Sequence, residues 1–416
     1  MKNVVFSPKI WEAENLQSED PKRILFAFFE TAIQSGLPVS VWKLPETDEC
    51  FAIIDVSLKP QKQKTNLSEC EPGFIFAPFN SNGGKDNLII KAHICLNINK
   101  KELTEIVPVS GNEEQIRKNT FLEKLQTRIR NGSMSEKLNW YTSKAKNIET
   151  IYTRSEFEKL VQDSVNFIRS GKVQKTVASR LEEVTLPHNF SPLKLWEQLG
   201  KLYESAFVSL VSIPNLGTWI GATPETLLKV SPDKIYTVSL AGTRVYNSEN
   251  PISQIKWGDK ETKEQELVSR FIREGFSKIS NTFTEYTPQT IRAGNVIHRQ
   301  TRFELDTTKD KVGVQSSQLL NWLHPTPAVC GLPQSEARAF ILEHEIHNRE
   351  YYSGFLGPVN LYGNTNLFVN LRCMKIKEDT AILFSGCGIT ADSVPEKEWE
   401  ETALKMQTIL SVLNND

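Results

Sequence analysis

Apolar residues recur along the chain at two different periods, and each period predicts one type of element. A spacing of three to four residues predicts helices, which cover residues 21–36, 155–170, about 259–277, 334–344 and 396–413. Shorter apolar or alternating runs between turn residues predict strands, which cover residues 39–42, 51–58, 74–79, 88–96, 174–180, 207–213, 218–220, 235–240, 295–301 and 367–374. Residues from about 100 to 150 are polar and predict a connecting region with charged helical pieces. No internal repeat interrupts this series of elements.

Two helix starts carry the sequence signature of a capping box, in which a hydroxyl side chain is followed three residues later by a glutamate. Ser155 with Glu158, and Ser393 with Glu396, fit this spacing. Ser393 also follows a Gly-X-Gly turn at residues 386–388. The end of the chain therefore predicts a strand, a glycine turn and a helix in succession.

Composition and charge narrow the classes of function. The chain has 416 residues, of which 39% are hydrophobic and 24% charged, and its formal net charge is −1 with no long block of one sign. These values are ordinary for a globular protein and give no support for a nucleic-acid partner. No apolar run approaches the ~18 residues of a membrane span, and the six cysteines are scattered without a CxxC pair. We therefore expect a cytoplasmic protein with free thiols, no membrane association and no zinc site.

Two of the predicted helices carry pairs of glutamates away from their apolar faces. Glu398 and Glu401 share one face with Lys405, and Glu261 lies three residues before Glu264. Each pair alone is what a solvated helix face would show. Each helix has an apolar face opposite its glutamate pair, so the two pairs could instead bind one cation together. Carboxylate oxygens favour Mg²⁺.

Five further positions could carry chemistry, and each also has a simpler structural interpretation. Lys175 lies inside a strand, where lysine is usually a solvated surface residue. Glu225 follows a Thr-Pro turn. It is either a carboxylate held in a functional site by this stiff backbone or a residue in the first turn of a helix. His298 lies among apolar residues, as a hydrogen-bonded core histidine would. Arg372 lies in an apolar strand, where a ligand carboxylate would supply its partner. The small residues of the turn 241–243 would let a ligand approach the backbone.

Nine stretches, in this order along the chain, resemble the motifs of the chorismate-utilising enzymes, the family of isochorismate, salicylate, anthranilate and aminodeoxychorismate synthases. They are residues 175–180, 221–228, 240–244, 260–268, 298–301, 323–333, 349–357, 371–373 and 386–405. The resemblance is weak before about residue 150. We therefore expect residues 1–150 to form the N-terminal portion, and residues 151–416 the chorismate-binding catalytic portion, of one structural domain. The resemblance implies an α/β (α+β) fold in which two antiparallel β-sheets pack face to face, with helices outside and the active site between the sheets.

Three positions separate the branches of this family, and all three favour the isochorismate synthases, which are isomerases. Lys175 stands where water-using members have their general base and ammonia-using members have glutamine. Ala241 stands where aminodeoxychorismate synthases have a nucleophilic lysine, and Ala328 where salicylate synthases tend to have threonine. A salicylate synthase remains an alternative because it shares Lys175, and a non-catalytic chorismate-binding subunit is a more distant one. Gln265 and Arg299 depart from the family pattern, which usually has histidine and leucine at these positions.

The resemblance also implies roles for the candidate residues in adding water at C2 of chorismate and expelling the hydroxyl from C4. Lys175 would be the general base and Glu225 the general acid, so the pKa of the amine must fall and that of the carboxyl must rise. Mg²⁺ would be held by carboxylates, with Glu264 and Glu401 as direct ligands and Glu261 and Glu398 as further ligands. Substrate would be bound by Ala241, Gly242, Thr243, His298, Tyr352, Arg372, Gly386, Gly388 and Lys405.

The same resemblance limits the expected partners. Water rather than ammonia is the implied nucleophile, so no glutamine amidotransferase subunit is expected. We expect a monomer or a weak homodimer whose product feeds menaquinone or catechol siderophore synthesis.

Overall fold

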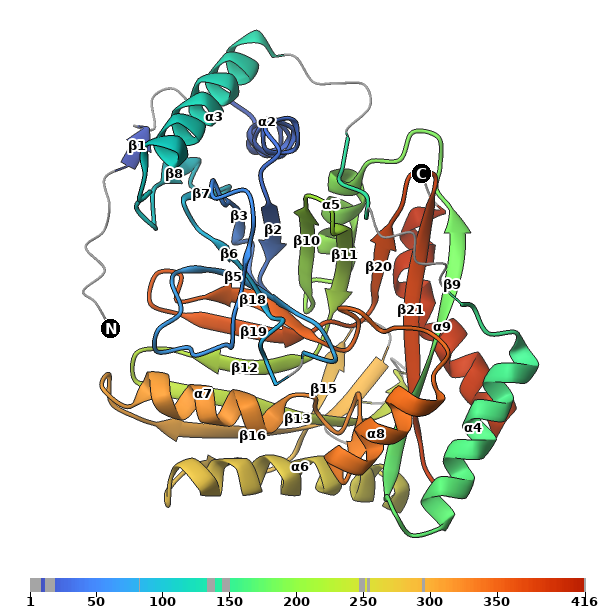
Figure 1. Cartoon of the computed structure of the whole chain (residues 1–416). Helices are drawn as coiled ribbons and strands as arrows, with labels where there is room; N and C mark the ends of the chain where they lie inside the picture. Colours follow the sequence, from blue (N-terminus) through green and yellow to red (C-terminus); the bar gives the residue numbers. More distant parts are fainter. Residues whose placement is uncertain are drawn as a thin grey trace.

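Two large antiparallel β-sheets form the framework of the protein, with helices on their outer faces (Figure 1). This arrangement confirms the fold class that the resemblance implies. The structure is a computed structural model that describes residues 9–11, 19–81, 83–132, 139–143, 150–246, 251–252, 255–293 and 296–414. The side chains of residues 9–11, 241, 243–245, 260, 293 and 296 lie outside this description.

The first sheet has eleven strands and combines both ends of the chain. In spatial order they are β1 (Lys9–Trp11), β8 (Glu102–Thr104), β7 (Ile94–Asn97), β3 (Cys50–Ile54), β2 (Val39–Lys43), β10 (Phe207–Ile213), β11 (Gly217–Thr223), β20 (Cys373–Ile376), β21 (Thr380–Ile389), β9 (Lys175–Thr185) and β17 (Gly331–Leu332). The pairing of β2 with β10 joins strands from the ranges 1–150 and 151–416 within one hydrogen-bonded ladder.

The second sheet has ten strands and likewise draws on both ranges. In spatial order they are β14 (Thr284–Glu285), β16 (Val296–Asp306), β13 (Lys234–Val245), β12 (Thr226–Val230), β19 (Thr365–Val369), β18 (Phe355–Val359), β5 (Gly73–Ala77), β6 (Leu88–Lys91) and β4 (Gln61–Lys62), while β15 (Gln289–Ala293) pairs with β16. In Figure 1 the strands of this sheet run across the view and those of the first sheet run up it, so the two sheets cross.

Aromatic side chains fill the space between the sheets. Phe207 of β10 stacks on Phe368 of β19 with ring centroids 4.1 Å apart. Phe76 of β5 meets Trp219 of β11 edge to face at 6.0 Å. All four rings are buried. Each pair joins a strand of one sheet to a strand of the other, so this layer is the core that holds the sheets face to face.

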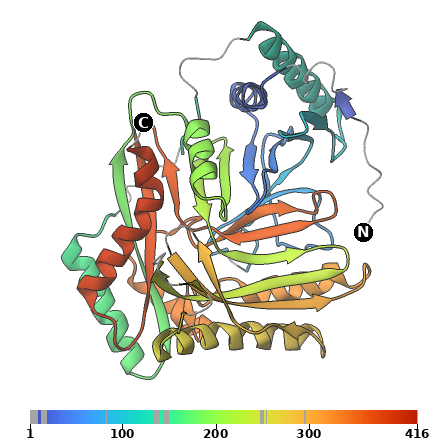
Figure 2. The ribbon, with the colours of Figure 1, turned by 180° about the vertical axis from the view of Figure 1, so that it is seen from behind.

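Helices cover the outer faces of both sheets, as the view from behind also shows (Figure 2). Buried apolar residues attach four helices to the eleven-stranded sheet: α2 (Pro21–Gln34), α3 (Asn112–Asn131), α5 (Pro192–Leu202) and α9 (Pro395–Leu413). The ten-stranded sheet carries α6 (Asp259–Ile279) and α7 (Val312–Leu323). The helices α4 (Arg154–Arg169) and α8 (Gln334–His344) pack beside β9 and β21.

Both capping boxes predicted from the sequence are wrong in the structure. A capping box does begin α4, but its members are Thr153 and Glu156, two residues before the predicted pair. α9 begins at Pro395 without a side-chain cap, and the Ser393 hydroxyl instead accepts the backbone N–H of Thr390 at 3.1 Å. The spacing alone does not select the cap, because the cap must be the residue whose backbone is still extended when the helix begins.

Two predicted strands are divided in the structure. The segment 88–96 forms β6 and β7, which separate at residues 92–93. The segment 367–374 is interrupted by Arg372, which has a left-handed φ of +48° between β19 and β20. The predicted connecting region contains the long helix α3, which ends before Gly132. Among the described residues, no helix combines the length and apolar character needed to cross a membrane.

Candidate active site

Lys175 begins β9 and its side chain is buried, so the interpretation as a solvated surface amine is wrong. Only 4% of the residue is exposed. Its Nζ donates to Oε1 of Glu264 on α6 at 3.1 Å. On the β21 side, a Cβ added to Gly388 would come within 3.3 Å of the same nitrogen. β9 therefore places the amine between α6 and Gly388. The predicted Gly-X-Gly turn at residues 386–388 is wrong, because these residues lie inside β21 and pair with β9.

Glu225 lies in the short connection between β11 and β12, so it is not in the first turn of a helix. Its backbone N–H donates to the Thr223 hydroxyl at 3.3 Å, and its Oε1 accepts the Thr326 hydroxyl at 3.3 Å. Burial raises the pKa of Glu225 to about 7, against the opposing effects of Thr326 and of the ammonium groups of Lys175 and Lys405. The predicted acid therefore lies within electrostatic range of the predicted base.

The end of β21 and the first turns of α9 bring a lysine and two carboxylates together. Gly386 lies beyond the residues of β21 that pair with β20, and its carbonyl accepts Lys405 Nζ at 2.8 Å. Lys405 also pairs with Glu401, one turn earlier on the helix, at 2.7 Å. Burial raises the pKa of Glu398, and the charge of Glu401 adds to the rise. The three side chains predicted to share a helix face are therefore neighbours.

Tyr352 and Arg372 approach these C-terminal elements from two loops. A Cβ added to Gly386 would come within 2.8 Å of the Tyr352 hydroxyl, so glycine leaves the room that this ring needs. Burial raises the pKa of Tyr352, which keeps the hydroxyl protonated as a donor. The Arg372 guanidinium donates to the Thr408 hydroxyl at 2.7 Å and to the carbonyl of Lys405 at 3.3 Å. The left-handed backbone at Arg372 thus directs its side chain onto α9.

His298 of β16 lies beside a bulge in β13. Gly242 forms the bulge with a φ of +74°, a conformation that favours glycine. Its backbone is hydrogen bonded to the His298 ring, yet burial lowers the pKa of His298 to about 4, so the imidazole is neutral near pH 7. Glu261 of α6 packs on this bulge, since a Cβ added to Gly242 would come within 3.0 Å of the Glu261 Cβ. The side chains of Ala241 and Thr243 lie outside the described residues.

The described candidate residues therefore form one connected cluster. A chain of hydrogen bonds and charge interactions runs from Glu264 through Lys175, Glu225 and Lys405 to Glu401. These residues come from α6, β9, the β11–β12 connection and α9, which are far apart in the sequence. Their catalytic and binding roles stay predictions, because proximity does not establish what a residue does.

Thr326 is a neighbour of this cluster that the sequence analysis missed. It lies between two prolines in the loop before β17, and the only sequence signal is that this loop is too rich in proline and glycine to be regular. The two departures from the family pattern have structural partners. The Gln265 amide donates to the hydroxyls of Ser269, at 3.0 Å, and Thr301, inside the contact between α6 and the sheet. Arg299 donates to the Thr262 hydroxyl at 2.7 Å.

The carboxylates at the site supply the donors that Mg²⁺ prefers. Glu398 and Glu401 repel each other, and a cation beside them would relieve that repulsion. Glu264 and Glu401 each have an ammonium partner. Within the described part of the chain, no three or more His, Cys, Asp and Glu side chains are grouped as metal ligands. The donor chemistry therefore fits Mg²⁺ only as an ion whose coordination is completed by water or substrate.

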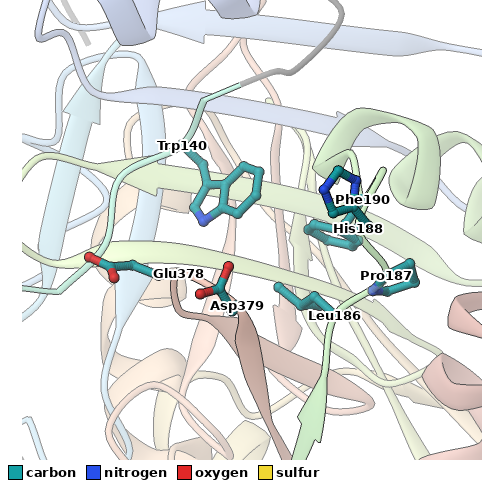
Figure 3. Close-up of a pocket in the computed structure, with 7 residues that line it drawn as sticks. All are labelled: Trp140, Leu186, Pro187, His188, Phe190, Glu378 and Asp379. Carbon is teal, nitrogen blue, oxygen red and sulfur yellow. The ribbon is translucent and has the colours of Figure 1, made fainter.

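Figure 3 shows a hollow on the surface that shares no lining residue with this cluster. It is lined by Trp140, Leu186, Pro187, His188, Phe190, Glu378 and Asp379. Leu186 follows the end of β9, whereas Lys175 begins it, and eleven residues of extended strand span roughly 35 Å. The hollow therefore belongs to the opposite end of the strand from the candidate active site.

Comparison with known proteins finds sequence relatives of this chain and a solved structure with the same fold. The isochorismate synthase EntC of Escherichia coli K12 is 29% identical over 270 residues, which are 64% of this chain and 68% of that protein. Anthranilate synthase component 1 of Aquifex aeolicus is 26% identical over 273 residues, which are 64% of this chain and 55% of that protein. The solved structure of MenF, the menaquinone-specific isochorismate synthase from Escherichia coli, has the same fold, with a TM-score of 0.76 over 93% of this chain and 91% of that chain at 20% identity.

The match to a protein family covers most of the chain. Residues 73–414 match the family described as chorismate binding enzyme. This range includes every candidate site residue and begins at the first residue of β5, so it also takes in part of the region where motifs are weak. The chain belongs to the chorismate binding enzyme family.

Proposed function

We propose that the protein is an isochorismate synthase, an Mg²⁺-dependent isomerase that converts chorismate to isochorismate. The observation that carries this proposal is a buried amine, Lys175, beside a carboxyl of raised pKa, Glu225. An isomerase that adds water and removes a hydroxyl needs a base and an acid at one ring. The sequence supports the water-using branch through Lys175, Ala241 and Ala328. EntC, which is named an isochorismate synthase, supports the same branch.

Glu225 is assigned as the general acid. Hydroxide is a poor leaving group, so cleavage of the bond between C4 and oxygen needs a proton that turns the departing group into water. With a pKa of about 7, a large share of Glu225 carries that proton near neutral pH. The ammonium groups of Lys175 and Lys405 would stabilise the carboxylate that remains after transfer.

Lys175 is assigned as the general base. Its amine takes a proton from the attacking water as the water oxygen bonds to C2, the ring double bonds shift, and the bond at C4 breaks. Two protons are thus exchanged, one accepted by Lys175 and one donated by Glu225, and no oxidant or reductant is needed. The hydrogen bond from Lys175 to Glu264 fixes the direction of the amine.

Positive and hydrogen-bonding groups are assigned to the substrate carboxylates. Arg372 and Tyr352 would bind the enolpyruvyl carboxylate, helped by Lys405 and by backbone N–H groups near Gly386 and Gly388. Desolvation lowers the pKa of Arg372, so an anionic ligand would offset the cost of holding its charge in a buried position. Both side chains are held in place before substrate binds. Arg372 is hydrogen bonded to α9, and Tyr352 packs against Gly386.

The remaining candidates line the ring and hold the ion. The neutral imidazole of His298 and the β13 segment 241–243, which contains the Gly242 bulge, would orient the ring rather than transfer protons. Glu264 and Glu401 would hold Mg²⁺, with two further carboxylates, Glu261 and Glu398, acting through water. When bound, the ion would neutralise the ring carboxylate and draw electron density from the ring.

The test is incubation of the protein with chorismate and Mg²⁺, followed by chromatographic separation of the products. Isochorismate without pyruvate is the expected result. Salicylate with pyruvate would identify a salicylate synthase, and anthranilate formed only with ammonia would identify an anthranilate synthase. No conversion under any of these conditions would reject the proposal in favour of a binding subunit.

A further inference from the structure

The outer edge of β9 loses its strand partner two residues after it begins. β17 pairs only with Lys175 and Thr176, and in the described part of the chain no further strand continues along this edge. Directly after this pairing ends, two side chains form hydrogen bonds with the exposed backbone of β9. Arg349 Nη2 donates to the carbonyl of Val177 at 2.9 Å, and Glu345 Oε1 accepts the N–H of Ser179 at 2.8 Å. A guanidinium and a carboxylate thus occupy the positions where backbone donors and acceptors of a next strand would lie.

The two side chains form a buried ion pair with two short hydrogen bonds. Arg349 Nε donates to Glu345 Oε2 at 2.7 Å and Nη2 donates to Oε1 at 2.6 Å. The side chains are 2% and 3% exposed. The guanidinium also lies over the Phe79 ring, 4.4 Å from its centroid. Planar bidentate pairing of this kind holds geometry more tightly than a lysine could.

Arg349 also reaches the loop that contacts Glu225. Its Nη1 donates to the carbonyl of Val329 at 2.8 Å. Val329 and Cys330 both donate their N–H groups to the carbonyl of Thr326, at 3.1 and 2.9 Å, which makes this segment a tight turn. The Thr326 hydroxyl at the start of that turn donates to Glu225. One guanidinium is therefore bonded both to the strand of the proposed base and to the turn beside the proposed acid.

We propose that Arg349 and Glu345 are positioning residues that replace a missing strand at the edge of β9 and set the distance between Lys175 and the Thr326–Glu225 contact. The catalytic part of this inference rests on the proposed function, whereas the support of the strand edge does not. A displacement of about 1 Å between an acid and a base can cost on the order of 10²-fold in rate. Neither residue need touch the substrate for its loss to lower kcat.

The experiment compares Arg349→Lys and Glu345→Gln with a matched control, Lys118→Met. Lysine keeps the charge at 349 but loses the bidentate geometry, and glutamine keeps an acceptor for Ser179 but loses the charge. Lys118 is also a buried cation in an ion pair, with Glu105 at 2.8 Å, and it lies on α3 away from β9. Each protein is examined by hydrogen exchange of the peptide covering residues 175–181 and by kcat and KM with chorismate.

The expected result is faster exchange in residues 175–181 in Arg349→Lys, with kcat lowered about 10- to 100-fold and KM changed less than about threefold. Glu345→Gln should show a smaller change in the same direction, and its measurement decides the matter if the lysine variant does not fold. Lys118→Met should leave both the exchange of this peptide and kcat unchanged.

Two outcomes overturn the inference. One is unchanged exchange in residues 175–181 in both variants, which would mean that the pair does not hold the strand edge. The other is faster exchange with kcat unchanged, which would mean that the held edge does not position the base. If the unaltered protein forms no isochorismate, the proposed function fails, and the exchange data still show whether the pair supports β9.

Discussion

At the scale of single residues, the surroundings of Glu225 determine whether the site can donate a proton. Burial raises its pKa, while a hydroxyl donor and two ammonium groups lower it. The net value near 7 means that loss of hydration outweighs the three favourable contacts. Because each contact favours the ionised form, each of them also makes the carboxyl a stronger acid than burial alone would allow.

Replacing Thr326 by valine tests this balance. Valine keeps the branched shape but removes the hydroxyl that lowers the pKa of Glu225, so that pKa should rise above its value of about 7. A general acid works only while it is protonated, and its activity falls as pH rises through its pKa. The alkaline limb of the pH profile of kcat/KM should therefore move to higher pH in Thr326→Val. A limb that stays in place would show that a group other than Glu225 is the acid.

Lys175→Gln tests the base. Glutamine has a similar reach but no basic nitrogen, so water at C2 would lose its proton acceptor and isochorismate formation should become undetectable. Chorismate should still bind in the presence of Mg²⁺, as isothermal titration calorimetry can measure. The control is Lys172→Gln, an exposed lysine three residues earlier, which should retain full turnover. Turnover comparable to the unaltered protein in Lys175→Gln would place the base elsewhere.

At this scale, the sequence identifies candidate residues but not their burial or their distant partners. Lys175, Glu225 and Glu264 could be chosen as candidates because the motifs around them are contiguous in the chain. The burial of Lys175 could not be predicted, since Lys175 becomes buried only when β21 and α6 close around it. Thr326 could not be found either, because its partner is 101 residues away.

At the scale of elements, β21 shows how two glycines in one strand can serve different needs. An added Cβ at Gly386 would meet the carbonyl of Ala178 at 2.9 Å and the Tyr352 hydroxyl at 2.8 Å. At Gly388 it would meet only the end of the Lys175 side chain, at 2.9 Å from Cε. The first position is constrained by backbone that cannot move aside, the second by a side chain that can.

Alanine at each glycine should therefore give different results. Gly386→Ala should lower the melting temperature as well as activity, because a backbone clash must be relieved by shifting β9 or β21. Gly388→Ala should fold with a nearly unchanged melting temperature but lose most of its kcat, because the amine is displaced. Calorimetric scans and steady-state kinetics on both variants measure the two effects. Equal melting temperatures in the two variants would contradict this explanation.

The helices show what local patterns predict and what they do not. Helical periodicity located α4, α6, α8 and α9 to within a few residues, because amphipathic spacing is a property of the segment itself. The start of α4 was misplaced because two overlapping hydroxyl–glutamate pairs have the same spacing. The interruption at Arg372 was missed because a left-handed residue held by α9 leaves no local signal.

At the scale of the whole molecule, the candidate site joins the two sheets. α6 packs on the ten-stranded sheet and carries Glu261 and Glu264, whereas α9 packs on the eleven-stranded sheet and carries Glu398 and Glu401. Without the family resemblance, the sequence could not predict that residues of α6 and α9 belong to one cluster, because the order of the strands depends on pairings such as β2 with β10 over more than 150 residues. Such pairings are set by the completed core between the sheets rather than by any local pattern.

Binding of Mg²⁺ by carboxylates from both helices would link the metal to the stability of the whole fold. A ligand that binds only the folded protein adds RT ln(1 + [L]/Kd), about 2.7 kcal/mol at 100 times Kd. For a protein of this length, that corresponds to a rise of roughly 2–5 °C in melting temperature. Mg²⁺ should therefore raise the melting temperature of the unaltered protein and EDTA should reverse the rise and abolish turnover.

The contribution of each helix can be separated with single substitutions. Glu264→Gln and Glu401→Gln should each remove most of the thermal shift. Each substitution deletes one charged ligand, Glu264 from the helix on the ten-stranded sheet and Glu401 from the helix on the eleven-stranded sheet. Glu400→Gln, an exposed neighbour on α9, should keep it. If only the α9 variant abolished the shift, the ion would be held by one helix and could not join the sheets. Turnover that persisted in EDTA would exclude the metal from the reaction, whatever the thermal data showed.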